Sequence, residues 1–197
     1  MPSDPDKIIL VHTCCGPCAE YPTRELLTAQ YQPTLLYYNP NIQPQIEWRR
    51  RCDSLRKLAD LLELELIVVG SAETEKWELM RDKAERCRYC YNTRLRKAAR
   101  YARDHGFTIF TTTLLVSPYQ DREQILALGH KLASQYKLDF FAADWRPGFR
   151  AGQQMAKDHA LYRQRYCGCV HSLSESKFKD KILTEHLALE NDTVPFD

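Results

Sequence analysis

The sequence lacks long apolar runs, a strong charge imbalance and repeats, and each absence excludes a class of protein. No apolar run in the 197 residues approaches the roughly 20 that a membrane-spanning helix requires. The start carries Asp4 and Asp6 before a short apolar run, whereas a secretory signal begins with a positive segment. The net charge is only +2, and no linker or low-complexity stretch divides the chain. We therefore expect one cytoplasmic domain, residues 1–197, that does not bind a membrane.

Short apolar runs alternate with helical patterns along most of the chain. This alternation predicts an α/β fold in which helices flank a parallel sheet. In such sheets ligands bind outside the carboxyl ends of the strands, and Cys14 directly follows the first expected strand. The segment before the last helix shows no regular pattern. Expected strands cover 7–13, 34–38, 66–69, 108–115 and 139–142, and expected helices cover 19–30, 45–63, 77–101, 122–136 and 172–185.

Eight cysteines are the most informative feature of the composition. Disulfides are rarely stable in a reducing cytosol, so cysteines in such a chain more often bind metal or perform thiol chemistry. Cys52 is the exception, because it shares an apolar helical stripe with Trp48 and Leu55 and is therefore expected in the core. The other seven form three groups: Cys14, Cys15 and Cys18; Cys87 and Cys90; Cys167 and Cys169.

The spacing of these groups predicts metal binding but leaves the metal open. Two cysteines three apart, such as Cys87 and Cys90, place their thiolates within reach of one metal ion. The spacing agrees with a four-thiolate zinc site at Cys87, Cys90, Cys167 and Cys169, and with a redox dithiol at Cys15 and Cys18. It also agrees with an iron–sulfur cluster and a further metal. Thiolate ligands do not separate zinc from iron, because both metals accept them.

A basic stripe lies around the second cysteine group. Nine Lys or Arg residues stand between Arg81 and Arg103 against two acids, Asp82 and Glu85. Such a stripe can neutralise nucleic-acid phosphates, which would make binding sensitive to salt. A solvated helix face is the alternative interpretation.

Five stretches, in order along nearly the whole chain, carry a family resemblance. They are 12–18 (HTCCGPC), 38–42 (YNPNI), 85–91 (ERCRYCY), 110–118 (FTTTLLVSP) and 162–169 (YRQRYCGC). With them the chain resembles the epoxyqueuosine reductases of the QueH type. The resemblance implies an α/β fold related to the adenine-nucleotide alpha-hydrolase and PP-loop (HUP) group. The phosphate-binding motif Ser-Gly-Gly-x-Asp-Ser is absent after the first expected strand, so ATP-driven activation is not expected.

The resemblance also implies a reaction and its cofactors. The reaction is the two-electron removal of the epoxide oxygen from epoxyqueuosine in the anticodon loop of tRNA, which gives queuosine. It requires a [4Fe–4S] cluster, an additional mononuclear iron beside it and an external electron donor. As a hypothesis, one cysteine of the first group joins Cys87, Cys90 and one tail cysteine around the cluster. The remaining thiols, Cys18 among them, then hold the second iron. The expected ligands are Cys14, Cys15, Cys18, Cys87, Cys90, Cys167 and Cys169, of which all except Cys18 are cluster candidates.

Residues near these motifs are candidates for proton transfer and for RNA binding. As catalytic proton donors we select His12, Tyr89 and Asp144, while Asp82 and Tyr166 lie near motif segments too. For each of them, packing or a supporting hydrogen bond is the alternative. Aromatic residues can stack on a base of an RNA loop while arginines contact its phosphates. The arginines selected for that role are Arg86, Arg88, Arg94 and Arg96.

Overall fold

A single parallel sheet forms the centre of the protein, whose computed structural model describes residues 7–192. The strand order is β3-β2-β1-β4-β5, and every neighbouring pair is parallel. The apolar residues of the central strand, such as Leu10 and Val11, are fully buried, because helices cover both faces of the sheet. The strands are β1 (Ile8–Thr13), β2 (Gln32–Tyr37), β3 (Leu66–Val68), β4 (Ile109–Thr112) and β5 (Asp139–Phe140).

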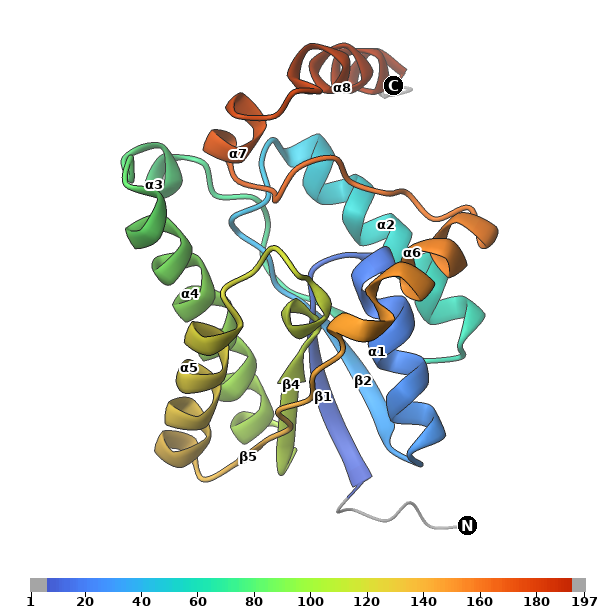
Figure 1. Ribbon diagram of the computed structural model, residues 1–197, viewed down its shortest axis with the longest axis vertical. Helices are drawn as coiled ribbons and strands as arrows, with labels where there is room; N and C mark the ends of the chain where they lie inside the picture. The colour runs from blue at the N-terminus through green and yellow to red at the C-terminus, as the bar shows by residue number, and fades with distance from the viewer. Residues whose placement is uncertain (1–6, 193–197) are drawn as a thin grey trace, which may run out of the picture.

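Helices lie on the two faces of the sheet and beyond one end of it (Figure 1). One face carries α4 and α5, and the other carries α1 and α2, with α6 packed on α1. The short helix α7 and the last helix α8 lie beyond the end at which the strands finish. The helices are α1 (Gly16–Thr28), α2 (Gln45–Leu61), α3 (Glu75–Glu78), α4 (Lys83–Asp104), α5 (Arg122–Tyr136), α6 (Phe149–Asp158), α7 (Val170–Ser174) and α8 (Lys179–Asp192), with 3-10 helices η2 (Thr113–Val116) and η3 (Arg146–Gly148).

The α/β fold class is confirmed, and the boundaries of α5 agree with the prediction. Two expected elements differ from the prediction because a polar side chain caps the start of a new helix within each of them. The expected helix over 77–101 is two helices, because Asp82 caps α4 by accepting a hydrogen bond from the Glu85 N–H at 2.8 Å. The expected strand over 108–115 ends at Thr112, whose hydroxyl accepts a bond from the Leu114 N–H and starts η2.

The last third of the chain is more helical than expected. The sequence predicts no helix between 142 and 172, but α6 forms there, with Gly152 and Ala156 as its buried residues. Because these residues are so small, they give no apolar periodicity to recognise. The expected helix over 172–185 is also two helices, α7 and α8, separated by a turn at Ser176. That residues 1–197 form one domain stays a prediction.

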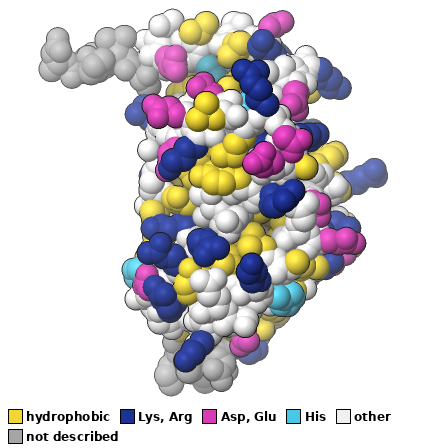
Figure 2. Space-filling model, turned by 90° about the vertical axis from the view of Figure 1, so that its left-hand side faces the viewer, with side chains coloured by type: hydrophobic (Ala, Val, Ile, Leu, Met, Phe, Trp, Pro, Cys, Tyr) yellow, Lys and Arg dark blue, Asp and Glu magenta, His cyan; other side chains and the backbone are white. Residues whose placement is uncertain are grey.

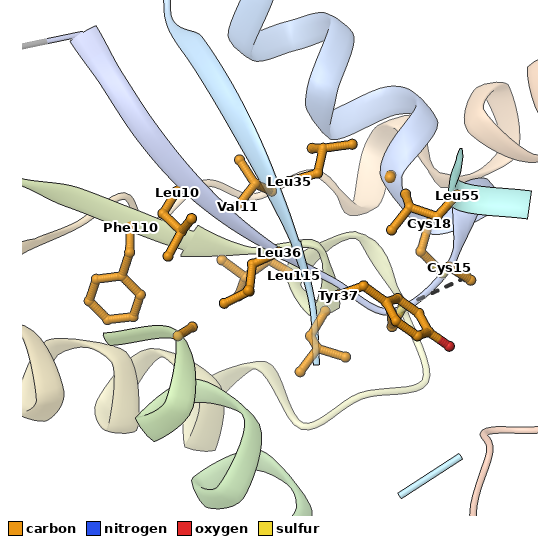
Figure 3. Packing of buried hydrophobic residues seen from close by; sticks show 14 of the residues in the cluster. Leu10, Val11, Cys15, Cys18, Leu35, Leu36, Tyr37, Leu55, Phe110 and Leu115 are labelled. Carbon is orange, nitrogen blue, oxygen red and sulfur yellow. Dashed lines mark hydrogen bonds between the residues drawn. The ribbon is translucent and has the colours of Figure 1, made fainter. Parts of the chain in front are cut away.

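The hydrophobic core extends up to the first cysteine group. Figure 3 shows Leu35 on one side of β2 and Leu36 near Leu115 on the other, with Cys15 and Cys18 towards the end of the strand. Cys52 is fully buried in the same core, as predicted. Among residues 7–192, no helix is both long and apolar enough to cross a membrane.

Candidate metal centre

Three cysteines meet where the first strand turns into the first helix. β1 ends at Thr13 and α1 begins at Gly16, so Cys14, Cys15 and Cys18 fall within one tight turn. Their sulfur atoms all lie within 4.8 Å of one another, and all three residues are buried. Gly16 is required because a Cβ there would lie 2.6 Å from the carbonyl oxygen of Ser54 on α2. The turn therefore presents three converging soft ligands.

The pKa values of the three thiols differ, and that of Cys14 is the one that is lowered. Hydrogen bonds from the Cys15 and Cys18 thiols hold the pKa of Cys14 well below its usual value, and the nearby Arg94 lowers it further. Burial raises the pKa of Cys15, and the bond to Cys14 raises the pKa of Cys18. Thr113, at the end of β4, adds a contact from its hydroxyl to the Cys14 sulfur at 3.8 Å. Cys14 is thus the thiol of the group that loses its proton most readily, and the thiolate is the form that binds metal.

The other four cysteines line a second cavity of about 220 Å³. Cys87 and Cys90 lie in the first turns of α4, while Cys167 and Cys169 come from the loop before α7. Burial raises the pKa of Cys87, and it raises the pKa of Cys90 to about 11. Both tail cysteines thus line one cavity together with Cys87 and Cys90.

Buried Arg51 of α2 holds the loop that carries the tail cysteines. Its guanidinium donates hydrogen bonds to the carbonyl oxygens of Cys167, at 2.9 Å, and Tyr166, at 3.0 Å. Its Nε lies 2.7 Å from Glu47, which also accepts bonds from Tyr162 and, on α8, His186. Burial raises the pKa of Glu47, but Arg51 and these hydrogen bonds outweigh it and bring the pKa to about 2.

The turn itself also depends on its glycine. Gly168 has a φ of +140°, a conformation that residues with a Cβ rarely adopt. Its carbonyl accepts a hydrogen bond from the Gln43 N–H at 2.8 Å, and the Gln43 side chain accepts one from Val170. The cysteines on either side are thereby held in place by contacts to the β2–α2 connection.

The two cysteine groups open onto adjoining cavities. The cavity at the first group, of about 320 Å³, is lined by Cys14 and Cys18 and also by Cys167. Its wall shares Tyr119, Gln120 and Cys167 with the second cavity. Both lie beyond the ends of β1 and β4, where the connections leave the sheet in opposite directions. This is the crevice in which ligands bind in open α/β sheets.

Most of this chain is similar in sequence to known proteins. Residues 9–175 match the family described as "QueH: Epoxyqueuosine reductase QueH". The chain belongs to the QueH family. The protein named epoxyqueuosine reductase QueH from Dehalococcoides mccartyi is 32% identical over 166 residues, which cover 83% of this chain and 91% of that protein. The one from Thermotoga maritima is 33% identical over 186 residues, with 87% and 93% covered. The protein is therefore an enzyme, an oxidoreductase.

A solved structure shares the fold. It is a predicted subunit of a tRNA methyltransferase from Methanocaldococcus jannaschii, with a TM-score of 0.50 over 75% of both chains. Only 14% of the residues are identical, so this likeness shows the fold alone.

His12, predicted as a proton donor, is part of the sheet's interior in this QueH-family chain. It is fully buried at the end of β1, with Nδ1 2.8 Å from the Thr112 hydroxyl and Nε2 3.2 Å from the Tyr38 carbonyl oxygen. Burial and the charge of Arg94 lower its pKa to about 3. His12 is therefore neutral near pH 7, and both of its nitrogens have hydrogen-bond partners. Its role as a proton donor stays a prediction.

Tyr89 and Asp144 also lie apart from the cysteine cavities. Tyr89 packs edge-on against Trp77 and faces a groove between α4 and α5. Asp144 is exposed, and its bonds to Arg146 lower its pKa to about 2, so it carries no proton to donate at neutral pH. Of the two further candidates, Asp82 is the cap of α4, whereas Tyr166 lines the first cavity and donates its hydroxyl proton to the Gln43 carbonyl.

The four predicted RNA-binding arginines divide into two pairs. Arg86 and Arg94 are each only 3% exposed, so their side chains lie below the surface, and their role in RNA binding stays a prediction. Arg86 donates to carbonyls at the start of α4, and Arg94 donates to the Cys90 sulfur at 3.2 Å. Arg88 and Arg96 do line the groove between α4 and α5, a cavity of about 860 Å³. Figure 2 shows this face of the molecule, where many Lys and Arg side chains are exposed.

Three polar residues of the site were missed at the sequence level. Arg51 and Glu47 lie four residues apart on α2, a spacing typical of exposed ion pairs as well as buried ones. Arg94 was selected as an RNA-binding residue, and its contact with a cysteine was not predicted. A signal was present, because Arg94 lies one helical turn beyond Cys90 and so on the same side of α4.

Proposed function

We propose that the protein is an epoxyqueuosine reductase that acts on tRNA. It removes the epoxide oxygen of epoxyqueuosine in the anticodon loop and gives queuosine. The observation that carries this proposal is the meeting of seven cysteines, from three distant segments, in two groups with a shared wall. Membership of the QueH family supports the reaction.

The cysteines fit the cofactors that such a reductase needs. Four cysteines around one cavity suit a [4Fe–4S] cluster, which takes four thiolate ligands. Three buried sulfurs within 4.8 Å suit a mononuclear iron with a position left for substrate. We therefore assign the cluster to Cys87, Cys90, Cys167 and Cys169 and the second iron to Cys14, Cys15 and Cys18. This assignment replaces the sequence-based division, which mixed the groups.

The reaction must deliver two electrons and two protons to an epoxide and release water, leaving a carbon–carbon double bond. Bound at these cysteines, the cluster and the iron would supply the electrons and a Lewis acid for the oxygen. Arg94, buried between the groups and within the electrostatic reach of Cys14 and Cys90, offsets the negative charge of their thiolates. The side-chain amides of Gln120 and Gln164 face Cys167 and Cys18 at 3.7 and 3.6 Å.

The α4–α5 groove, lined by exposed Arg88 and half-buried Arg96, gives the RNA a place to bind. Arg88, Arg96 and Lys131 line the α4–α5 groove, and Tyr91 lines both this groove and the cluster cavity. A strand whose phosphates follow the groove would thus reach the site. The double variant Arg88→Ala, Arg96→Ala should weaken tRNA binding and reduce its salt slope by about 1 per lost contact. Exposed Arg100 of the same helix lies outside the groove, so Arg100→Ala is the control. If the double variant binds tRNA with the affinity and salt slope of the wild type, the groove is not the RNA-binding surface.

The reaction is tested with anaerobically reconstituted protein, a chemical reductant and tRNA that contains epoxyqueuosine. Mass spectrometry of the digested RNA should show a nucleoside that has lost one oxygen atom. Cys90→Ala should abolish this product, while Cys52→Ala should keep it, because Cys52 lies in the core and lines neither cavity. If fully reconstituted wild-type protein leaves the epoxide intact, the proposed function is wrong.

A further inference from the structure

Tyr119 is the side chain with the most unusual position at the mouth of the site. Its exposed fraction is 83%, a value that among the exposed large hydrophobic residues is matched only by Leu79 within the described part of the chain. Single exposed aromatic residues are common on protein surfaces, so exposure alone assigns nothing. Tyr119, however, lines both cysteine cavities, whereas Leu79 lines neither of them.

The backbone holds this ring in a rigid turn. Pro118 precedes it, the Gln120 N–H donates to the Ser117 carbonyl, and the Tyr119 N–H contacts the Ser117 hydroxyl at 3.3 Å. The turn is fastened to α4 as well, because the Tyr91 hydroxyl donates to Gln120 at 2.9 Å and accepts from the Asp121 N–H. An exposed aromatic ring on a fastened turn loses little conformational freedom when a ligand binds against it.

The surroundings of the ring fit a nucleobase. Phe149, at the start of α6, meets Tyr119 edge-on with ring centroids 5.9 Å apart, and it lines the first cavity too. The same wall carries the amides of Gln120, Gln153 and Gln164, which can both donate to and accept from the polar edge of a base. Proteins that recognise unpaired RNA bases use this combination of a stacking ring and polar side chains.

We propose that Tyr119 stacks on the target base of the tRNA and thereby directs its modified side ring into the cavity beside Cys14 and Cys18. This inference rests on the proposed function and adds the residue that binds the base. Phosphate contacts in the α4–α5 groove hold the strand, whereas Tyr119 acts on the base alone. Its contribution is therefore insensitive to salt, because stacking releases no counterions.

A double-mutant cycle tests the proposal with reconstituted protein and anticodon stem-loop RNA. One RNA carries epoxyqueuosine at the target position, and the other has no base there. Tyr119→Ala should weaken binding of the first RNA about 5- to 150-fold, the range expected for one base stacked on an aromatic ring, at every salt concentration. It should leave the binding of the baseless RNA unchanged. Tyr119→Phe keeps the ring and should bind like the wild type, and Leu79→Ala is the control for an equally exposed residue.

The outcomes separate this inference from the proposed function. If Tyr119→Ala binds the modified RNA as tightly as the wild type, the stacking role is wrong. The same holds if it loses equal affinity for both RNAs, because the ring then contacts another part of the loop. A variant with normal RNA binding but slow turnover would place the ring at an electron donor and overturn the proposal. If the wild type itself does not distinguish the two RNAs, recognition of the base fails, and the proposed substrate fails with it.

Discussion

Replacing Arg51 should both destabilise the protein and release the cysteines that depend on it. The residue is 1% exposed, pairs with fully buried Glu47 at 2.7 Å and donates to two backbone carbonyls of the tail loop. Arg51→Met leaves the Glu47 charge buried with only neutral partners or a histidine, and breaking such a pair costs about 3–5 kcal/mol. The carbonyls of Tyr166 and Cys167 also lose their hydrogen-bond donor. They add no separate cost to this figure, because the loop that carries them is then free to move towards water.

The free energy of unfolding is measured by urea titration of the metal-free protein, so that metal binding does not contribute. Arg51→Met should lose about 3–5 kcal/mol, and Arg51→Lys, which keeps the charge but not the planar fork, should lose less. The double variant Glu47→Gln, Arg51→Met should be more stable than Arg51→Met alone, because no buried charge is left unpaired. A loss below about 1 kcal/mol for Arg51→Met would refute the reasoning.

The remaining predictions concern acid stability, the division of the metals and the reduction potential. The pKa of Glu47 is about 2 in the folded protein against an ordinary value of 4.5. The stabilisation that the Glu47 charge contributes is therefore complete above about pH 5 and is lost as the pH falls towards 2. The urea midpoint of the wild type should fall more steeply with acid than that of Glu47→Gln, and parallel curves would contradict the role of this charge. Cys18→Ala should lose about one iron and keep all sulfide, whereas Cys90→Ala should lose sulfide, as measured by iron and sulfide analysis; loss of both in Cys18→Ala would reject the division. Arg94→Gln should lower the cluster's midpoint potential by roughly 60 mV, equivalent to a tenfold change for one electron, because a buried positive charge favours the reduced state. Arg94→Lys should retain most of that potential in a spectroelectrochemical titration, and equal potentials in Arg94→Gln and wild type would contradict it.

Local signals in the sequence were sufficient for the sheet and for most of the helices around it. The bounds of α5 were predicted because an apolar pattern follows Asp121, whose carboxylate accepts the Gln124 N–H at 3.0 Å. α6 was missed because it packs on α1 through close approach of small residues. A Cβ at Gly152 would lie 3.1 Å from the Cβ of Tyr21, so the contact depends on glycine having no side chain and not on an apolar side chain.

The candidate site was predictable only within each cysteine group. Three cysteines in one turn must lie close together, and their position after the first strand placed them at the ligand-binding end of the sheet. The meeting of Cys167 and Cys169 with Cys87 and Cys90 depends on how the tail crosses the sheet's end, which no local pattern contains. The sequence also did not show which charged side chains are buried. The sequence shows the same residue type at Arg94, against a cysteine sulfur, and at Arg88, in an open groove.

The most direct test of this account is an anaerobic count of iron, zinc and acid-labile sulfide on the purified wild-type protein, together with its absorbance spectrum. A cluster at four of the cysteines and one iron at the other three predict about five irons and four sulfides per chain, with broad absorbance near about 400 nm. One zinc and no sulfide, even after anaerobic reconstitution, would contradict the iron–sulfur reductase and leave a zinc-stabilised RNA-binding protein in its place.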